Sequence, residues 1–378
     1  MGKPAAEPLL KIGIVFDDSL DKPDGVQQYI LSLGSWLSQQ GHEVHYLVGQ
    51  TKRTDIKNVH SLSRNIGVTF NGNQLSIPLP TAKGKLRRLL AVEKFDVLHV
   101  QVPYSPWLAH RIIMAAPSNT TIIGTFHIVA FSRLVQLATR GLAFWTRRSL
   151  RRFSKVVSVS SAAVDYARAT YGISTTVVPN VFDYDRFHTA QPLLPAQSTM
   201  LRILYLGRLV ERKGCRDLLQ AIKYLVERGV TGFTVVICGK GPLLSELEQF
   251  SNRHQLPVEF TGFVAETDKP GYYASADIAV FPSTGGESFG IVLLEAMASG
   301  RAAVLAASNS GYASVMADRP DLLFKPKDSL ALARLLEDLI SQPHKRTQAA
   351  AWGLNYSQKF DVPIIGQQLL TSYRLPPA

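Results

Sequence analysis

The sequence predicts an α/β protein made of two doubly wound domains in series, with a cleft between them. Short β-branched runs alternate with helical stretches along the chain, a pattern typical of βαβ units and parallel sheets. The length of 378 residues is more than a single core usually serves. With 46% hydrophobic residues and few low-complexity runs, the composition is that of a globular protein.

Strands are expected at β-branched runs bounded by polar or glycine-bearing stretches. In the first half these runs are KIGIVF, HEVHYLV, VLHVQVP, TTIIGTF, KVVSVS and STTVVP, and in the second half LRILYLG, FTVVICG, VEFTGFV, IAVFPS and AAVLAAS. Helices are expected between them, for instance over 25–40, 215–228 and 290–299. The polar, proline-bearing stretch 187–200 is the expected linker. In such sheets ligands bind beyond the carboxyl ends of the strands.

Composition and charge exclude several classes of protein. No stretch reaches the roughly 20 apolar residues of a membrane-spanning helix, and the first residues show no apolar signal segment. Cys215 and Cys238 provide neither a disulfide framework nor zinc-binding spacing, so a reducing cytoplasm is expected. The net charge is +12, and between Ile56 and Val164 only two acids accompany fifteen Lys or Arg residues. One domain is therefore expected to be strongly basic and the remainder about neutral.

The stretch GGESFGIVLLEAMASG, residues 285–300, combines an apolar helix with two carboxylates, Glu287 and Glu295. A carboxylate among apolar side chains is costly unless it is paired. Sugar hydroxyls or a ribose diol would satisfy both glutamates, while the free N–H groups at the helix start would bind a phosphate. The alternative is that both glutamates pair with nearby arginines.

The ends of this helix are also predicted from its sequence. Ser288 is a candidate N-cap, so the helix is expected to begin near Phe289. Gly300 is expected to follow its last turn.

A second stretch, LYLGRLVERKG at 204–214, places Arg208 and Lys213 after a strand. Two cations at the carboxyl end of a strand suit a diphosphate, because arginine binds it as a fork and lysine as a point charge. The alternative is a solvated loop. The later stretch VVICGKGPLL contains only G-x-G and lacks the third glycine of the dinucleotide fingerprint, which argues against a nicotinamide cofactor.

Together these motifs resemble the family 4 retaining glycosyltransferases of GT-B fold. The likeness rests on the two glutamates eight residues apart and on GRLVERKG about eighty residues upstream. DKPDGVQQYILSLGSWLSQQGHEV is similar to the family's glycine loop and first helix. VPNVFDYDRF is similar to the segment before its linker, and VPIIGQQLLTSYRL to its last helix. The resemblance covers nearly the whole chain.

The resemblance implies two Rossmann-like domains facing a central cleft. The N-terminal domain, 1–185, would face the acceptor and the membrane, and the helix over 362–378 would cross back to it. The C-terminal domain, 186–361, would bind the nucleotide-sugar donor.

The resemblance also implies roles for individual residues of the donor site. Arg208 and Lys213 would bind the diphosphate and stabilise the leaving nucleotide. Glu287 would hold the donor sugar and Glu295 the ribose diol. The backbone at the helix start would cradle phosphate and sugar, through Phe289, Gly290, Ile291 and Val292.

In the N-terminal domain the resemblance implies contacts with both substrates. Gly25 would let the backbone approach the diphosphate, although the family's glycine pair is here Asp24–Gly25. His127 follows the strand TTIIGTF, where the family places a histidine near the reacting sugar; a lone histidine in such a position is otherwise often structural. Gln27 and Asn71, the latter in the stretch FNGN, would contact the acceptor.

No metal ion is expected in this scheme. The stretch Asp183-Tyr184-Asp185 has the D-x-D form of the other large glycosyltransferase fold, but its place before the linker favours a turn or helix cap. The charge of the leaving group would fall to Arg208, Lys213 and helix N–H groups. Retention of configuration would follow the front-face reaction of the family.

Within the family the sequence is most similar to the bacterial phosphatidylinositol mannosyltransferases. That likeness implies GDP-mannose as donor, because Glu266 and Lys269 align with guanine contacts and a carboxylate accepts both N1–H and the N2 amine of guanine. Two departures affect the acceptor: a tyrosine after the first strand is Asp18 here, and an arginine beyond FNGN is Ser76. They weaken the case for a phosphoinositide acceptor, though not for a lipid.

Two basic stretches with interleaved apolar residues, 83–95 and 133–155, predict a peripheral membrane surface. The alternative is a solvated helical face whose apolar side belongs to the core. The cations assigned to the membrane are Lys83, Lys85, Arg87, Arg88, Arg147, Arg148, Arg151 and Arg152.

The leading hypothesis is thus a hexosyltransferase at the cytoplasmic membrane face, with a nucleotide sugar and an anionic lipid surface as partners and no cofactor. One alternative within the fold is a UDP-glucose enzyme, or one acting on a soluble sugar or polyprenol-linked glycan. A nucleic-acid-binding protein is disfavoured, because no helix-turn-helix, zinc spacing or stacking motif accompanies the charge.

Overall fold

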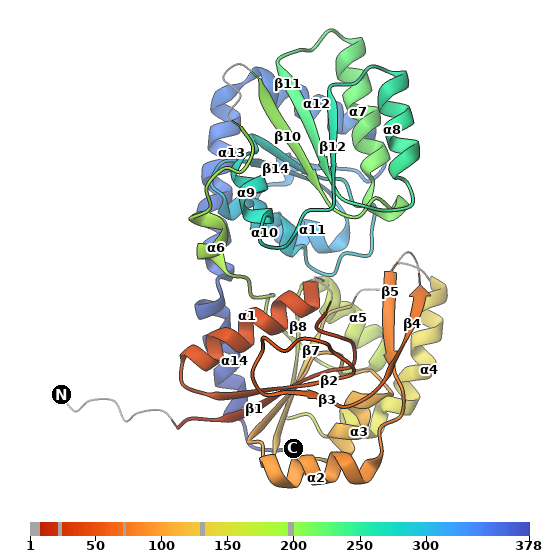
Figure 1. Cartoon of the computed structure of the whole chain (residues 1–378), viewed down its shortest axis with the longest axis vertical. Helices are drawn as coiled ribbons and strands as arrows, with labels where there is room; N and C mark the ends of the chain where they lie inside the picture. The colour runs from red at the N-terminus through yellow and green to blue at the C-terminus, as the bar shows by residue number, and fades with distance from the viewer. Residues whose placement is uncertain (1–7, 22–24, 71–72, 129–132, 196–199) are drawn as a thin grey trace, which may run out of the picture. The chain divides into compact units, whose positions relative to one another are not determined.

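The computed structural model describes residues 8–21, 25–70, 73–128, 133–195 and 200–378. The chain forms two compact units, the first made of 1–181 with 362–378 and the second of 182–361. Each unit has its own parallel sheet (Figure 1). The division at Val181/Phe182 lies four residues before the boundary expected from the sequence. Residues 187–195 pack on the second unit instead of linking the two, for example through Leu193 N–H and the Ser275 hydroxyl at 2.9 Å.

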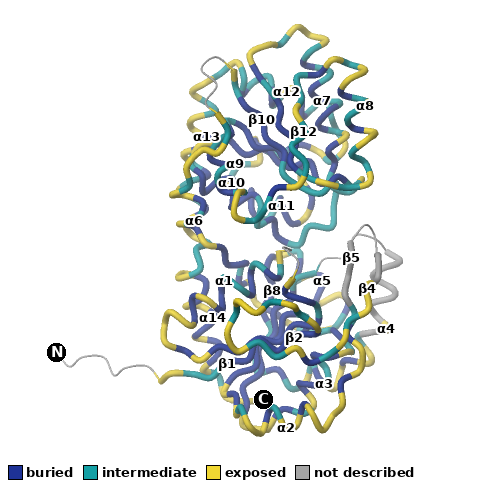
Figure 2. The backbone as a smooth tube through the Cα atoms, in the orientation of Figure 1, coloured by how far each residue is buried: buried dark blue, intermediate teal, exposed yellow. Residues whose placement is uncertain are grey.

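The first unit contains a seven-stranded parallel sheet in the order β3-β2-β1-β6-β7-β8-β9. Its middle strands are buried on both faces, as their continuous β-branched runs predict. Figure 2 shows the resulting buried band. The strands are β1 (Lys11–Phe16), β2 (Glu43–Val48), β3 (Val59–Ser61), β6 (Val97–Val100), β7 (Thr121–Phe126), β8 (Lys155–Ser158) and β9 (Thr176–Val177).

Helices cover this sheet, and the last helix of the chain is one of them. The helices are α1 (Gly25–Gln39), α2 (Lys83–Glu93), α3 (Leu108–Ala115), α4 (Arg133–Leu150), α5 (Ser161–Tyr171) and α14 (Val362–Tyr373). Ile365, Leu369 and Tyr373 of α14 join the core that α1 forms with β1 and β2. The Tyr373 hydroxyl lies 2.7 Å from Nδ1 of His99. The C-terminal helix is thus an integral part of the first unit.

An antiparallel hairpin of β4 (Asn65–Phe70) and β5 (Asn73–Pro78) stands apart from the main sheet. The sequence reading missed it, although its alternating apolar residues and the Asn-Gly dipeptide between the two runs are a hairpin signal. Ser76 lies on β5, opposite Gly67. Asn71 lies outside the described residues.

The second unit contains a six-stranded parallel sheet in the order β12-β11-β10-β13-β14-β15. The strands are β10 (Leu201–Leu206), β11 (Phe233–Cys238), β12 (Val258–Gly262), β13 (Ile278–Phe281), β14 (Ala303–Ala307) and β15 (Leu323–Phe324). The helical segments are α6 (Tyr184–His188), η1 (Glu211–Lys213), α7 (Cys215–Glu227), α8 (Leu244–Arg253), α9 (Lys269–Ala274), α10 (Ile291–Ala298), α11 (Ser310–Val315), η2 (Pro320–Leu322), α12 (Ser329–Ser341), α13 (Pro343–Ser357) and η3 (Gln358–Phe360).

Both sheets reverse their strand order at one point, and this places the candidate sites. In the first sheet the reversal falls between β1 and β6, and in the second between β10 and β13. Ligands of doubly wound sheets bind at the carboxyl ends of the strands at such switch points. The residues that follow these four strands are therefore the candidates for ligand binding.

The net charge follows the division into units. Residues 182–361 contain nineteen Lys or Arg and nineteen Asp or Glu, so the whole +12 belongs to the first unit. This confirms the expected charge asymmetry. Among the described residues no helix is both long enough and apolar enough to cross a bilayer.

Candidate functional site

The donor-site residues predicted in the second unit lie at its switch point. Arg208 comes two residues after β10, and Lys213 ends the short η1 that follows. Glu287 lies in the loop after β13, the neighbouring strand. Segments about eighty residues apart in sequence therefore meet at one edge of the sheet.

Glu287 is held by three side chains. Its Oε1 accepts hydrogen bonds from Arg212 Nη1 at 2.7 Å, Lys213 Nζ at 2.8 Å and Ser283 Oγ at 2.7 Å. Burial alone would raise the pKa of this carboxyl, but Lys213 and Arg212 outweigh it and lower the pKa to about 2. Glu287 is thus a partly buried carboxylate that is ionised at physiological pH.

Sequence reasoning missed Arg212 and Ser283, the second cation and the hydroxyl of this cluster. Arg212 stands next to Lys213, so its charge was visible, but its direction depends on the turn of η1. Ser283 is 1% exposed and precedes the glycine pair of the loop. Only the folded loop brings its hydroxyl to Glu287.

Backbone contacts hold the two loops of this cluster together. Gly214 has φ of +70°, and a Cβ there would lie 2.1 Å from the carbonyl oxygen of Pro282, so only glycine permits this approach. Thr284 N–H donates to the Arg212 carbonyl at 2.8 Å. The cations of η1 are therefore placed against the loop that carries Glu287.

Helix α10 begins two residues later than the sequence suggested. Its N-cap is Gly290, with φ of +119°, so the prediction of Ser288 as N-cap is wrong. Tyr312 packs so closely that a Cβ on Gly290 would lie 2.6 Å from its ring, which explains the glycine. Phe289 is buried, while Ile291 and Val292 form the half-buried first turn. Gly300 follows the helix with φ of +66°, as predicted.

Glu295 lies eight residues after Glu287, inside α10, and has a different environment. It is 5% exposed, and its Oε2 has no hydrogen-bond partner among the described residues. Burial raises its pKa, Lys269 opposes that shift and Glu266 adds to it. The alternative that both glutamates pair with arginines therefore holds for Glu287 only.

Glu266 and Lys269, the predicted base contacts, form an ion pair with each other. Arg186 of α6 donates to the Glu266 backbone oxygen and lies 4.0 Å from its carboxylate. The D-x-D stretch lies beside them: Asp183 is the N-cap of α6 and accepts the Arg186 N–H at 3.0 Å. This confirms that Asp183 caps a helix.

The G-x-G stretch supports the Arg208 loop. A Cβ on Gly239 would lie 1.9 Å from the Gly207 carbonyl oxygen, and one on Gly241 would lie 2.2 Å from that of Leu209. The two glycines let the loop after β11 pack directly on the backbone around Arg208. They are explained by this packing, without a dinucleotide.

In the first unit, His127 follows β7 at the carboxyl edge of the sheet. Its Nε2 lies 2.9 Å from Gln101 Oε1, and its ring packs edge-on against Tyr29 with centroids 4.9 Å apart. Burial lowers the pKa of His127 to about 3. The ring is therefore neutral at physiological pH.

The loop after β1 contains Asp17, which sequence reasoning passed over. Its carboxylate is 7% exposed, accepts the Ala109 N–H at 2.7 Å and bonds the Ser105 hydroxyl. Burial raises its pKa to about 6, despite these hydrogen bonds. Asp17 thus anchors the start of α3 beneath the loop.

Two residues predicted to contact substrates lie just beyond this loop. Gly25 is the exposed first residue of α1. Gln27 is only 3% exposed, and its amide donates to the Ser19 carbonyl at 3.1 Å. The structure therefore gives Gln27 a supporting contact with the loop instead of an open face for an acceptor. Asp18 accepts the N–H of Ser19 at 2.6 Å.

The basic residues of α2 are exposed, but its leucines are not. Leu86 and Leu90 are 1% and 3% exposed and belong to the core. Leu86 and Leu90 therefore pack as the alternative of a core-facing apolar side expects, although Val92 of the same helix is 70% exposed. Its exposed cations are Lys83, Lys85, Arg87 and Arg88.

Helix α4 differs, because it exposes large apolar side chains beside its cations. Phe144 and Trp145 are 78% and 76% exposed. Arg147, Arg148 and Arg151 are exposed next to them.

Arg152 is the exception among these cations. Its guanidinium donates to the carbonyls of Ile113 at 2.6 Å, Ala116 at 2.9 Å and Pro117 at 3.2 Å. It holds the end of α3, which corrects the prediction that Arg152 binds the membrane.

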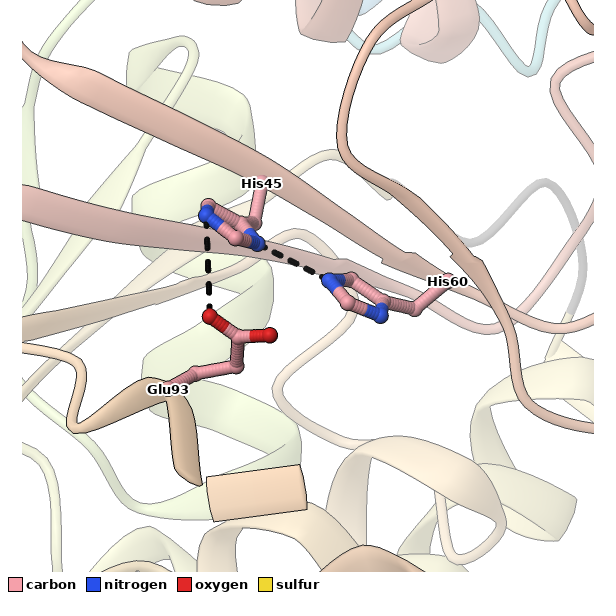
Figure 3. A group of neighbouring side chains, drawn as sticks. All are labelled: His45, His60 and Glu93. Atoms are coloured by element: carbon pink, nitrogen blue, oxygen red, sulfur yellow. Dashed lines mark hydrogen bonds and ion pairs between the residues drawn. The ribbon is translucent and has the colours of Figure 1, made fainter. Parts of the chain in front are cut away.

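One cluster of side chains contains metal-ligand types. His45 of β2, His60 of β3 and Glu93 of α2 lie together (Figure 3). Nδ1 of His45 is 2.8 Å from His60, while its Nε2 is 2.8 Å from Glu43 and 3.9 Å from Glu93. Lys11 bridges the two carboxylates at 2.8 and 2.7 Å. Both nitrogens of His45 already face partners and the Lys11 ammonium bridges the two carboxylates, so the cluster joins strands and helix and is not a prepared metal site.

Two parallel α/β units and a switch-point cluster of cations and carboxylate define the class: a nucleotide-sugar glycosyltransferase of GT-B fold. Comparison with known families supports this class along the chain. The family described as glycosyl transferases group 1 matches residues 192–353, and glycosyltransferase family 4 matches residues 23–186. The chain belongs to the group 1, family 4 glycosyltransferases, as the motifs predicted.

The similarity to known proteins extends over nearly the full length of this chain. A phosphatidyl-myo-inositol mannosyltransferase of Mycolicibacterium smegmatis is 30% identical over 369 residues, 96% of this chain and 93% of that protein. One of Propionibacterium freudenreichii is 29% identical over 383 residues, with 96% and 94% covered. A GDP-mannose-dependent alpha-(1-6)-phosphatidylinositol monomannoside mannosyltransferase of Mycobacterium tuberculosis is 28% identical, with 80% and 81% covered.

Solved structures confirm the fold. The crystal structure of Anabaena HepE in complex with UDP and glucose has a TM-score of 0.70 and 21% identity, over 96% of this chain and 99% of that one. Membership of the family makes the chain a glycosyltransferase that uses a nucleotide-sugar donor.

Proposed function

We propose that this chain transfers mannose from GDP-mannose to a lipid acceptor at the cytoplasmic face of a membrane, retaining the anomeric configuration and needing no metal ion. The observation that carries the donor half is the cluster of Glu287, Arg212, Lys213 and Ser283 at the switch point of the second unit. The names of the full-length relatives support the sugar and the lipid.

The chemistry follows from the charges of this cluster. In the transfer, the bond between the anomeric carbon and the phosphate oxygen breaks, and negative charge develops on the leaving diphosphate. Lys213, Arg212 and Arg208 supply positive charge where that oxygen departs, as preorganised groups that need no reorientation. They take the place of a divalent cation in the proposal. The acceptor oxygen bonds to the same face of the sugar and passes its proton to the departing phosphate.

Glu287 is assigned to the sugar, because Arg212 and Lys213 keep its carboxylate ionised whether or not a substrate is bound. Arg212 and Lys213 hold its pKa at about 2. An ionised carboxylate accepts hydrogen bonds from sugar hydroxyls and is about twice as strong an acceptor as a neutral group. Glu295, whose Oε2 is buried and has no hydrogen-bond partner among the described residues, offers an acceptor to a ribose diol.

The preference for guanine rests on Glu266 and Lys269. Their side chains are 20% and 15% exposed and pair with each other, so the carboxylate lies close to the surface. It accepts both N1–H and the N2 amine of guanine, a pairing that uracil does not offer.

The proposal that the protein binds a lipid surface rests on features of the first unit. The whole net charge of the chain resides there. Helix α4 adds exposed Phe144 and Trp145 beside Arg147, Arg148 and Arg151, which is the composition of an interfacial segment. Helix α2 contributes cations and one exposed apolar side chain, Val92, while Leu86 and Leu90 are in the core.

Asp18 favours a second candidate acceptor. A carboxylate repels a phosphate, and Asp18 stands in the loop after β1, where the resemblance to the mannosyltransferases implies a tyrosine. A lipid whose acceptor hydroxyl lies farther from its phosphate, or a neutral glycolipid, fits this loop better than phosphatidylinositol.

The test is a transfer assay with the full chain. GDP-mannose and UDP-glucose are each offered with vesicles that contain phosphatidylinositol or a neutral diacyl glycolipid, and the lipid products are identified by mass spectrometry, with and without a chelator. We expect mannosylated lipid from GDP-mannose, undiminished by the chelator. Transfer from UDP-glucose alone, UDP binding tenfold tighter than GDP, or chelator-sensitive transfer would each refute the corresponding part of the proposal.

A further inference from the structure

Gln101 and His127 are brought together by the register of two strands. Gln101 directly follows β6, and His127 directly follows β7. The strands pair in parallel, with Val100 opposite Gly124, so both residues leave the same edge of the sheet. His127 Nε2 lies 2.9 Å from Gln101 Oε1, and Gln101 is fully buried.

The surroundings of the His127 ring disfavour a charge on it. Its polar neighbours are the amides Gln101 and Asn180, and burial lowers the pKa while Asn180 opposes the shift only in part. The titratable groups that face the ring are Tyr29, packed edge-on, and His99 of β6. Burial raises the pKa of Tyr29 and lowers that of His99 to about 3, so both are neutral.

His99 and His127 differ in how completely they are satisfied. His99 has a partner at each nitrogen, the Thr125 hydroxyl at 2.6 Å and the Tyr373 hydroxyl at 2.7 Å. It is a core histidine. Beside His127, by contrast, Gln101 Nε2 and Asn180 Oδ1 are buried and have no partner among the described residues.

These two unpaired atoms indicate which kind of group would complement the site. A buried donor or acceptor left unpaired costs about 1–3 kcal/mol, and native proteins rarely leave one without a ligand or water. Gln101 Nε2 is a donor and Asn180 Oδ1 an acceptor. A hydroxyl group is the simplest complement, because it accepts one hydrogen bond and donates another.

We infer that Gln101 is a positioning residue that holds the His127 imidazole neutral and in one tautomer, and that Gln101 and Asn180 offer their remaining amide groups to a substrate hydroxyl. The Nε2–H of His127 donates to the Gln101 oxygen, which leaves Nδ1 as an acceptor. His127 then acts on its ligand as a hydrogen-bonding dipole and not as a general acid. The identity of the hydroxyl as part of a sugar rests on the proposed function; the state of the ring does not.

The first test is NMR of the imidazole nitrogens in the ¹⁵N-histidine-labelled full chain, with the His127 signal assigned by its loss in His127→Gln. We expect one neutral tautomer, protonated at Nε2, from pH 8 down to pH 5. In Gln101→Glu the carboxylate should raise the pKa so that the ring titrates between pH 5 and 8. In Gln101→Leu the tautomers should mix. Gln249→Leu, the same change on α8 of the other unit, should leave the His127 signals unaltered.

The second test separates turnover from binding. With the nucleotide sugar as varied substrate, Gln101→Leu should lower kcat about tenfold to a hundredfold while KM for the donor changes less than threefold. Gln101→Glu should add a loss of activity on the acid side of the profile, at the pH where its His127 charges. Circular dichroism identifies a variant that has not folded, and Gln101→Glu keeps the buried volume if Gln101→Leu fails.

The two outcomes are independent of the donor assignment. A wild-type His127 that titrates near pH 6.5, or a tautomer unchanged in Gln101→Leu, would overturn the inference whatever the activity. A preparation that transfers no sugar, but shows the expected ring state, would refute the proposed function and leave the positioning role of Gln101 standing.

Discussion

Glu287 of the second unit and two histidines of the first unit respond to burial in opposite ways. In the second unit Glu287 keeps its charge, because Lys213 and Arg212 outweigh burial and hold its pKa at about 2. In the first unit His99 and His127 lose theirs, with pKa values lowered to about 3 by burial. The net charge of the units shows the opposite contrast: the first unit carries the whole net charge of the chain, and the second unit has a net charge of zero. The difference shows that counter-ions within hydrogen-bonding distance, and not the net charge of a unit, decide the state of a buried group.

The largest effect is expected where the charged cluster is broken. Replacing Lys213 or Glu287 with alanine should lower transfer at least a thousandfold, about 4 kcal/mol of transition-state stabilisation. The reason is that Glu287→Ala leaves Arg212 and Lys213 without their carboxylate, while Lys213→Ala removes one of the two cations at Glu287.

The control for these variants is Glu227→Ala, which removes an exposed carboxylate paired with Lys223 in the same unit. Its activity should match wild type. Initial rates, and donor binding measured by calorimetry, check the cluster variants and the control. Lys213→Ala with more than a tenth of the wild-type rate would show that the cluster is only structural.

The next effect concerns the charged surface of the first unit. Arg147, Arg148 and Arg151 changed together to glutamate should weaken binding to anionic vesicles by about a hundredfold or more, since each cation near such a surface contributes about 1 kcal/mol. GDP affinity should be unchanged. Vesicle sedimentation over a salt series measures the effect, and binding of the wild type should fall as salt rises.

The matched control for that variant reverses cations of the neutral unit: Arg253, Arg301 and Arg334 to glutamate. Vesicle binding should persist in this protein. Equal loss in both variants would mean that total charge, and not the surface of α4, binds the membrane.

The two units should also respond to acid in different windows. The folded pKa of His99 and of His127 lies below the usual 6.5, so the unfolded chain binds more protons below that pH, and stability of the first unit falls between about pH 6.5 and 3. The folded pKa of Glu287 is below its usual 4.5, so its contribution is lost only between about 4.5 and 2. Hydrogen exchange read by mass spectrometry should show β6 and β7 losing protection at higher pH than β10 and β13. Simultaneous loss would contradict this order.

The smallest effect is expected at Asp17, whose pKa is raised in the fold, whereas the pKa values of His99, His127 and Glu287 are lowered. Its folded pKa of about 6 exceeds the usual 3.8, so it destabilises the fold progressively as pH rises between those values. Asp17→Asn can still accept the Ala109 N–H. The variant should therefore gain stability relative to wild type between pH 4 and 7, as denaturant melts at both pH values would show. A difference independent of pH would mean that Asp17 titrates normally in the fold.

Much of the fold was predictable, because strands and helices follow local periodicity. All eleven predicted runs contain strands, and the three helices named at 25–40, 215–228 and 290–299 are α1, α7 and α10. The missed strands are short or lie in the hairpin β4–β5, whose Asn-Gly signal was overlooked. The later start of α10 was missed because the contact of Tyr312 with Gly290, twenty-two residues away, decides it.

The sequence by itself determined the α/β class, the family and the residue types of the site, since these depend on periodicity and on motifs that are contiguous in the chain. Tertiary structure decided which groups meet: Arg212 and Ser283 at Glu287, Gln101 at His127, and Arg152 at the end of α3 instead of at a membrane. Leu86 and Leu90 were assigned to the core in the same way. The physical reason is that hydrogen bonds and ion pairs act over about 3 Å, and only the register of the sheet and the packing of its loops bring distant residues that close.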